Sequence, residues 1–199
     1  MSEPPTQRFR VADLDDVEVV VALVESAYRG ERAAATWSSE AELIGGQRTD
    51  AAMVTATIGD PDTTVLLLIS SDADADPDTD ADTDDVVIGC CELRSPDEHG
   101  RSLLGMFAVD PDLQAAGIGR RVLAEGERVA AAMGAASVEL HVIGLRHELI
   151  AWYERRGYRR TGERIPFPYG DERFGVPRRD DLHFEVLRKP LGGGGGRVG

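Results

Sequence analysis

The sequence is short of cysteine and of long apolar runs, and each shortage excludes a class of protein. Its 199 residues include two cysteines, which stand side by side as Cys90 and Cys91 on a predicted strand. Neighbouring side chains on a strand point to opposite faces, so we expect no disulfide between them and at least one to be buried. No cysteine and histidine spacing suits zinc, so no metal site is expected. No run of 18 apolar residues is present, and the polar N-terminus is unlike a secretory signal. These absences favour one cytoplasmic domain without a membrane span.

Positive charge is scarce too. The formal net charge is -14, which argues against nucleic acid as a partner. Eight of the acidic residues are aspartates within 71–85, between two apolar runs, and without their charges the total would be -6. We interpret 71–85 as a solvated, self-repelling loop insertion that joins two strands. Its alternating aspartates offer calcium ligands as an alternative, but the glycine and the final glutamate of an EF-hand are missing.

Apolar periodicity predicts an alternation of helices and strands in one domain, 1–191. A capping box of Ser39 and Glu42 predicts a short helix through Leu43 and Ile44. Gly157 is placed to end a later helix, and the chain closes in a flexible Gly-rich tail, 192–199. We expect strands at 9–11, 65–69, 86–94, 103–109 and 137–142, one from residue 158, and a last one through residues 182–186. Further helices are expected over about 17–28 and 148–156, and one that opens with the motif at 114–119 and runs through about residue 133.

The most informative segment is Val109–Arg121, which leaves a buried strand, turns, and opens a helix with Gln-x-x-Gly-x-Gly. Gly117 and Gly119 let a ligand approach the backbone, and the first N–H groups of a helix attract anions. These features predict a phosphate cradle. A dinucleotide fingerprint does not fit because Val122 stands at its third glycine, and a P-loop does not fit because no lysine is near. The alternative is a glycine-containing helix start that binds nothing.

What fits is the Gln/Arg-x-x-Gly-x-Gly/Ala motif that grips the pyrophosphate of coenzyme A, and here the chain resembles the GNAT superfamily of acyl-CoA-dependent N-acetyltransferases. A second segment, Arg146–Tyr158, is similar to the family's Asn-x-x-Ala-x-x-x-Tyr-x-x-x-Gly-Phe/Tyr motif. The order of elements over residues 7–191 is also the family's order. The resemblance implies an α/β fold of the α+β kind, a mixed, mostly antiparallel twisted sheet of about six to seven strands flanked by helices on both faces.

The resemblance also implies which residues hold acetyl-CoA, the expected co-substrate. In the family, the strand before the cradle and the next strand splay apart, and the pantetheine arm lies between them. The backbone at the end of the first strand would pair with pantetheine and with the acetyl carbonyl, and backbone N–H groups of the cradle would hold the pyrophosphate. The implied cofactor-binding residues are Phe107, Ala108, Val109, Gln114, Ala115, Ala116, Gly117, Ile118, Gly119, Arg120 and Arg146.

Three residues are candidates for catalysis. Tyr153 matches the family tyrosine whose hydroxyl stands near the CoA sulfur, where it can protonate the thiolate that develops. The base that takes the amine proton is less clear, and we rank His141, which shares its strand face with Glu139, above Glu92. Each has a structural alternative, core packing for the tyrosine and an ordinary polar strand position for the other two.

The expected function is therefore acetyl transfer from acetyl-CoA to a primary amine of a small molecule or protein, by direct attack in a ternary complex. The alternative is a non-catalytic acyl-CoA-binding sensor or interaction module. The loop 161–181 and the acidic residues near the second helix, including Glu40, Glu42 and Asp50, are weak candidates for walls of the acceptor site. A homodimer is plausible by resemblance alone.

Overall fold

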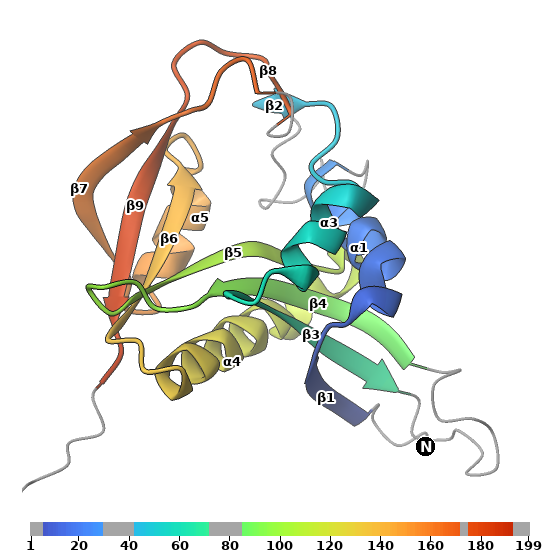
Figure 1. Cartoon of the computed structure of the whole chain (residues 1–199). Helices are drawn as coiled ribbons and strands as arrows, with labels where there is room; N and C mark the ends of the chain where they lie inside the picture. The colour runs from blue at the N-terminus through green and yellow to red at the C-terminus, as the bar shows by residue number, and fades with distance from the viewer. Residues whose placement is uncertain (1–5, 30–41, 72–84, 172–174, 193–199) are drawn as a thin grey trace, which may run out of the picture.

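The computed structural model describes residues 6–29, 42–71, 85–171 and 175–192. Its centre is a seven-stranded sheet in the order β1-β3-β4-β5-β6-β9-β7, and in the described part of the chain only β5 and β6 pair in parallel (Figure 1). A separate two-stranded sheet pairs β2 with β8. The strands are β1 (Thr6–Val11), β2 (Ile44–Gly45), β3 (Thr63–Ser71), β4 (Asp85–Arg94), β5 (Arg101–Val109), β6 (Ser137–Ile143), β7 (Arg159–Pro166), β8 (Val176–Pro177) and β9 (His183–Pro190).

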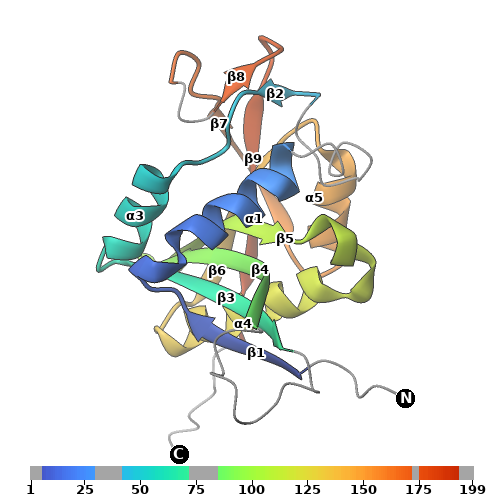
Figure 2. The same ribbon diagram turned by 90° about the vertical axis from the view of Figure 1, so that its right-hand side faces the viewer.

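Helices cover both faces of this sheet (Figure 2). On one face, α1 (Val17–Arg29) packs against β4 and β5, and α3 (Ala51–Gly59) packs against β3. On the other face lies α4 (Ile118–Ala132), and α5 (His147–Glu154) adds buried side chains to the same core as α4. Two 3-10 helices, η1 (Leu14–Asp16) and η2 (Pro111–Ala116), precede α1 and α4. The predicted mixed, mostly antiparallel sheet with helices on both faces is thus confirmed.

Strand β3 shows why the central strands are apolar at every position. Val65, Leu67 and Ile69 belong to the core under α1 and α3, whereas Leu66 and Leu68 belong to the core under α4. Successive residues of a strand point to opposite faces, so a strand that is covered on both faces cannot alternate between apolar and polar residues. The unbroken run Val65–Ile69 is the sequence signature of this position in the sheet.

The two cysteines follow the same rule on β4. Cys90 lies in the core under α1 and Cys91 in the core under α4, and both are free thiols without exposed surface. The expected absence of a disulfide between them is confirmed. Burial raises the pKa of Cys90 to about 12, so this thiol stays protonated and packs as a small apolar group.

The carboxylate of Asp16 holds the start of α1 in place through hydrogen bonds. Asp16 accepts hydrogen bonds from both terminal nitrogens of Arg10, at 2.5 and 2.6 Å, and from the backbone N–H of Asp13 at 2.8 Å. These bonds tie β1 to the start of α1. Hydrogen bonds from Arg10 hold the pKa of Asp16 below its ordinary value, although burial opposes this shift.

One predicted helix is wrong, and one helix was not predicted. Ile44 and Gly45 form strand β2 instead of ending a helix, because they pair with Val176 and Pro177 far along the chain. The helix that follows, α3, begins at Asp50, whose side chain accepts from the backbone N–H of Met53 at 2.8 Å. Ser39 of the expected capping box, and most of the acidic segment 71–85, lie outside the described residues. No helix in the described ranges is long and apolar enough to cross a membrane.

Candidate active site

The site opens where two parallel strands separate. Strands β5 and β6 pair only at Arg101–Leu103 with Ser137–Glu139, and from there toward Val109 and Ile143 no pairing between them is recorded in the described structure. The gap exposes the backbone of β5 to a ligand, because the neighbouring strand no longer uses its hydrogen-bonding groups. This is the splay that the family resemblance implied.

A β-bulge in β5 lies beside this gap. Cys90 of β4 pairs with Ala108, but Glu92, two residues further on, pairs with Gly105, three residues back on β5. The extra residue is accommodated at Met106, which has a φ of 40°, the left-handed region that a non-glycine residue rarely adopts. The carbonyl of Phe107 turns toward α1 and accepts a hydrogen bond from the Tyr28 hydroxyl at 2.8 Å. Nothing in the local sequence indicated this bulge or the role of Tyr28.

A cavity of about 260 Å³, which we call the larger cavity, lies against the bulge and the start of α4. Gly117 joins η2 to α4 with a φ of 79°, which glycine adopts at no steric cost, and a Cβ at this position would meet no atom within 4 Å. The larger cavity therefore faces the N-terminus of a 15-residue helix. Its walls are Ala27, Tyr28, Phe107, Ala108, Val109, Gly117, Gly119, Arg120, Arg146, Leu149, Trp152, Tyr153 and Arg156.

Three guanidinium groups line the larger cavity. Arg120 stands in the first turn of α4, and Arg146 precedes α5 with 8% of its surface exposed. Arg156 lies over the ring of Trp152, with 3.5 Å from guanidinium carbon to ring centroid, and donates to the Trp152 carbonyl at 2.8 Å. Burial lowers the pKa of Arg156, and the nearby charges of Arg155 and Arg120 lower it further. This concentration of positive charge suits a polyphosphate.

Tyr153 stands at the inner end of the larger cavity, with 4% of its surface exposed. Its ring meets those of Trp152, Tyr158 and Phe107 at centroid distances of 5.0, 5.6 and 6.2 Å, all near edge-to-face. Burial raises the pKa of the Tyr153 hydroxyl well above 10, while the positive charge of Arg146 opposes this shift. The hydroxyl therefore keeps its proton at neutral pH.

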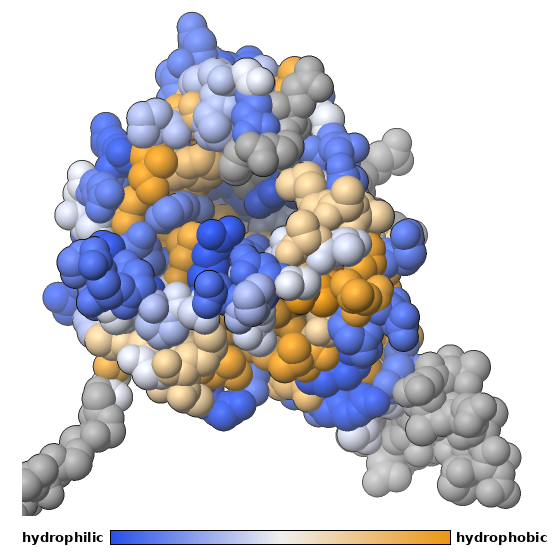
Figure 3. Space-filling model, in the orientation of Figure 1, coloured by the Kyte–Doolittle hydropathy of each residue, from blue (hydrophilic) through white to orange (hydrophobic). Residues whose placement is uncertain are grey.

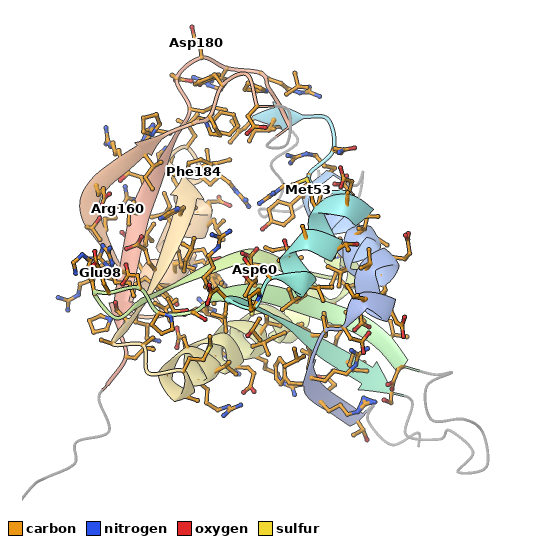
Figure 4. All side chains as sticks on the ribbon, viewed as in Figure 1. Met53, Asp60, Glu98, Arg160, Asp180 and Phe184 are labelled. Carbon is orange, nitrogen blue, oxygen red and sulfur yellow. The ribbon has the colours of Figure 1, made fainter. Side chains whose placement is uncertain are left out.

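A smaller cavity, of about 110 Å³, lies on the other side of Tyr153. The two cavities share five walls: Tyr28, Phe107, Arg146, Leu149 and Tyr153. The surface is hollowed between β6 and α3, below the β2–β8 sheet (Figure 3). Phe184 lies on the inner side of this opening, whereas Asp180 stands at its outer tip (Figure 4). The other walls of the smaller cavity are Ile44, Arg48, Leu104, Gly105, Met106, Leu140, His141, Val142, Ile143, Phe167 and Phe184.

Of the two base candidates, His141 lines the smaller cavity, and Glu92 does not appear among the described walls of either cavity. His141 Nε2 lies 3.0 Å from Glu139 Oε1, and Glu139 also accepts from Arg188 at 2.6 Å. Burial opposes ionisation of Glu139, but the hydrogen bonds from Arg188 and His141 outweigh it and lower the pKa of this carboxyl. Glu92 lies behind the bulge, near Gly105, and pairs with Arg94 at 3.3 Å.

The structure gathers most of the residues expected to bind the cofactor. Ile118 is buried in the first turn of α4, and residues 114–116 form the last turn of η2. The expected residues that line the larger cavity are Phe107, Ala108, Val109, Gly117, Gly119, Arg120 and Arg146.

Fewer of the residues expected to form walls of the acceptor site lie at a cavity. Asp50 caps α3, Glu40 lies outside the described residues, and residues 161–166 of the expected long loop belong to strand β7. Phe167 from this region does reach the smaller cavity.

Sequence reasoning missed Tyr28, Arg48, Trp152 and Arg156 as wall residues. For Trp152 and Arg156 a signal was present, because residues four apart share a helix face, as do Leu149 and Tyr153. For Tyr28 and Arg48 the sequence held no such signal, because the residues that they contact in the site lie far away in the chain.

Comparisons with known proteins agree with this geometry. The model of the Acetyltransferase (GNAT) family matches residues 51–158, more than half of the chain. A search of curated proteins found no match.

Among solved structures, the ribosomal-protein-S18-alanine N-acetyltransferase from Escherichia coli matches with a TM-score of 0.62 and 14% identity over 98% of this chain and 99% of that chain. The PaiA N-acetyltransferase from Thermoplasma acidophilum, solved with coenzyme A, matches with a TM-score of 0.60 and 15% identity over 93% and 99%. A GNAT-family acetyltransferase from Staphylococcus aureus Mu50 matches with a TM-score of 0.60 and 14% identity over 94% and 99%. At such identities these likenesses show a common fold, and the family match carries the assignment: the chain belongs to the GNAT family of acetyltransferases.

Proposed function

We propose that the protein transfers an acetyl group from acetyl-CoA to a primary amine of a small molecule or protein, by direct attack in a ternary complex. The observation that carries this proposal is the meeting of two cavities at Tyr153 and Phe107, where β5 and β6 part. Two substrates that enter from the two cavities would touch at this point, and direct transfer requires such an approach.

The larger cavity fits acetyl-CoA. The N-terminus of α4 and the guanidinium groups of Arg120 and Arg156 offer donors to the pyrophosphate. The bulge leaves the backbone of Met106 and Phe107 out of the pairing with β4, and we assign the pantetheine arm and the acetyl carbonyl to this end of β5. Backbone N–H groups at this bulge would stabilise the oxyanion that forms when the amine attacks.

We assign to Tyr153 the role of hydrogen-bond donor to the leaving thiolate of CoA. The pKa of Tyr153 lies above that of an ordinary thiol, about 8.5, so the tyrosine holds its proton before the reaction and can donate a hydrogen bond as the thiolate develops. The neighbouring charge of Arg146 further stabilises negative charge at this point.

His141 is assigned as the base, with Glu139 orienting its ring through the 3.0 Å contact. The attacking amine must be neutral, and His141 lines the cavity from which the amine would come. The matched comparison is His141→Gln against Glu92→Gln. We expect the first to change the pH–rate profile and the second to leave it as in the parent; an unchanged profile for His141→Gln would remove the base assignment.

The second candidate function is an acyl-CoA-binding module without catalysis, which is favoured by the absence of a carboxylate on β5. Calorimetric titration with acetyl-CoA, followed by CoA release in a panel of amines, separates the two. Saturable binding with amine-dependent CoA release supports the transferase. Binding without release from any amine supports the module, and no binding overturns both.

A further inference from the structure

The smaller cavity has an unusual charge for a site that would receive an amine. Its described walls include two guanidinium groups, Arg48 and Arg146, and no aspartate or glutamate. A protonated amine or a polyamine would meet repulsion there. A ligand that brings its own negative charge would instead be attracted.

Arg48 is positioned for such a ligand by its surroundings. The Glu25 carboxylate of α1 accepts the backbone N–H groups of Arg48 and Thr49, the latter at 2.7 Å, and so anchors this turn to the helix. The guanidinium of Arg48 lies over the Tyr28 ring, 5.1 Å from its centroid. In the described part of the chain it forms no ion pair with a carboxylate. The charge therefore faces the smaller cavity with its hydrogen-bond donors still available.

Much of the wall of the smaller cavity is apolar. Ile44, Ile143 and Phe167 are buried there, and the rings of Phe167 and Phe184 stack with 5.7 Å between centroids. A volume of about 110 Å³ accommodates a compact group and leaves no room for a folded polypeptide segment. The walls thus combine two guanidinium groups with buried apolar side chains, next to the point where the acetyl group would be transferred.

Building on the proposed acetyl transfer, we propose that the acceptor is a small amine that also bears a carboxylate, such as an α-amino acid with an apolar side chain, and that Arg48 binds this carboxylate. A guanidinium and a carboxylate form paired, charge-assisted hydrogen bonds. The remaining positive charge from Arg146 disfavours protonation of the amine, which helps to supply the neutral nucleophile. The apolar walls take the side chain.

The test compares L-phenylalanine with L-phenylalaninamide, which differ in the carboxylate, and uses spermidine as a polycationic acceptor. We expect kcat/KM from CoA release to be at least about tenfold higher for the acid than for the amide, as one charged hydrogen bond implies, and lowest for spermidine. In Arg48→Gln, the KM for phenylalanine should rise about tenfold with little change in kcat, and the acid and amide should become equivalent. Arg179→Gln is the matched control, since Arg179 pairs with Asp181 at 2.8 Å and lines neither cavity.

Equal kcat/KM for acid and amide in the parent, or an unchanged acid preference in Arg48→Gln, would overturn this inference and leave acetyl transfer intact. A binding measurement separates it from failure of the transfer itself. We expect N-acetyl-L-phenylalanine to bind the CoA-loaded protein about tenfold more tightly than its amide in calorimetry. That preference without CoA release from any amine would reject the transferase and retain the carboxylate site, whereas equal affinities would reject the site.

Discussion

Strands β3, β4 and β5 are covered by helices on both faces, whereas β6 and β9 carry polar and apolar side chains together on the face turned away from α4. On that face, Glu139, His141 and Arg188 form a connected set of hydrogen bonds beside the smaller cavity. The first half, β3 to β5, lies between the two apolar cores. In the second half, which begins at β6, the pairing with β5 stops after Leu103 and leaves backbone groups available to a ligand. The strands between the two apolar cores thus differ from the strands that line the smaller cavity with polar groups, and the two sets adjoin at the bulge in β5.

The largest expected effect tests the stabilising half. Leu67→Ala removes a side chain of β3 that has no exposed surface, and we expect the free energy of unfolding to fall by about 2–5 kcal/mol. Ile165→Ala on the edge strand β7, where the residue is half-buried, should cost about 1 kcal/mol. Urea unfolding of both variants measures the contrast; similar losses would mean that the two halves are equally stabilising.

The next effect tests the reactive half. Tyr153→Phe should lower kcat about 100-fold through loss of the donor to the thiolate, while the Kd for acetyl-CoA stays within about twofold. Because burial keeps the pKa of Tyr153 above 10, this residue should add no alkaline break to the parent's pH–rate profile below about pH 10. Single-turnover rates and calorimetry check both parts, and a variant with the parent's kcat would exclude Tyr153 from the chemical step.

A smaller effect separates binding from chemistry. Arg156→Gln removes a charge that is held over Trp152 in the larger cavity, and we expect the Kd for acetyl-CoA to rise about tenfold. Arg155→Gln is the matched control, because this neighbour is exposed and lines neither cavity. The difference between the two variants should shrink as salt is raised, since phosphate contacts are screened. Equal affinities at low salt would contradict a phosphate role for Arg156.

The smallest expected effect is again on the free energy of unfolding. Asp16→Asn should cost about 1 kcal/mol, because the charged hydrogen bonds from Arg10 are lost. The pKa of Asp16 is lowered in the folded state, so its stabilisation is complete above the ordinary value of 3.8 and disappears as the pH falls through the folded value. Unfolding curves of parent and variant should therefore differ at pH 6 and converge once the pH falls below the lowered pKa of Asp16. A constant difference across this range would assign the effect to packing instead of charge.

Patterns that depend on neighbouring residues were predictable. The strands around Val65–Ile69 and Leu103–Val109 follow from apolar runs, and the start of α4 after Gly117 follows from the glycine pattern. Strand β2 was not predictable, since Ile44 pairs with residues more than 130 positions away. The same holds for Tyr28, whose hydroxyl meets the carbonyl of Phe107 across a separation of 79 residues.

The sequence by itself determined the class of fold, the position of the glycine-bearing start of α4 and the candidates Tyr153 and His141, because helix and strand periods and helix-start chemistry are local properties. Tertiary structure alone decided the bulge at Met106, the parting of β5 from β6, and the gathering of Arg48, Arg120 and Arg156 around two joined cavities. Those features come from contacts between segments that are distant in the chain, and their free energies exist only once the segments have packed together.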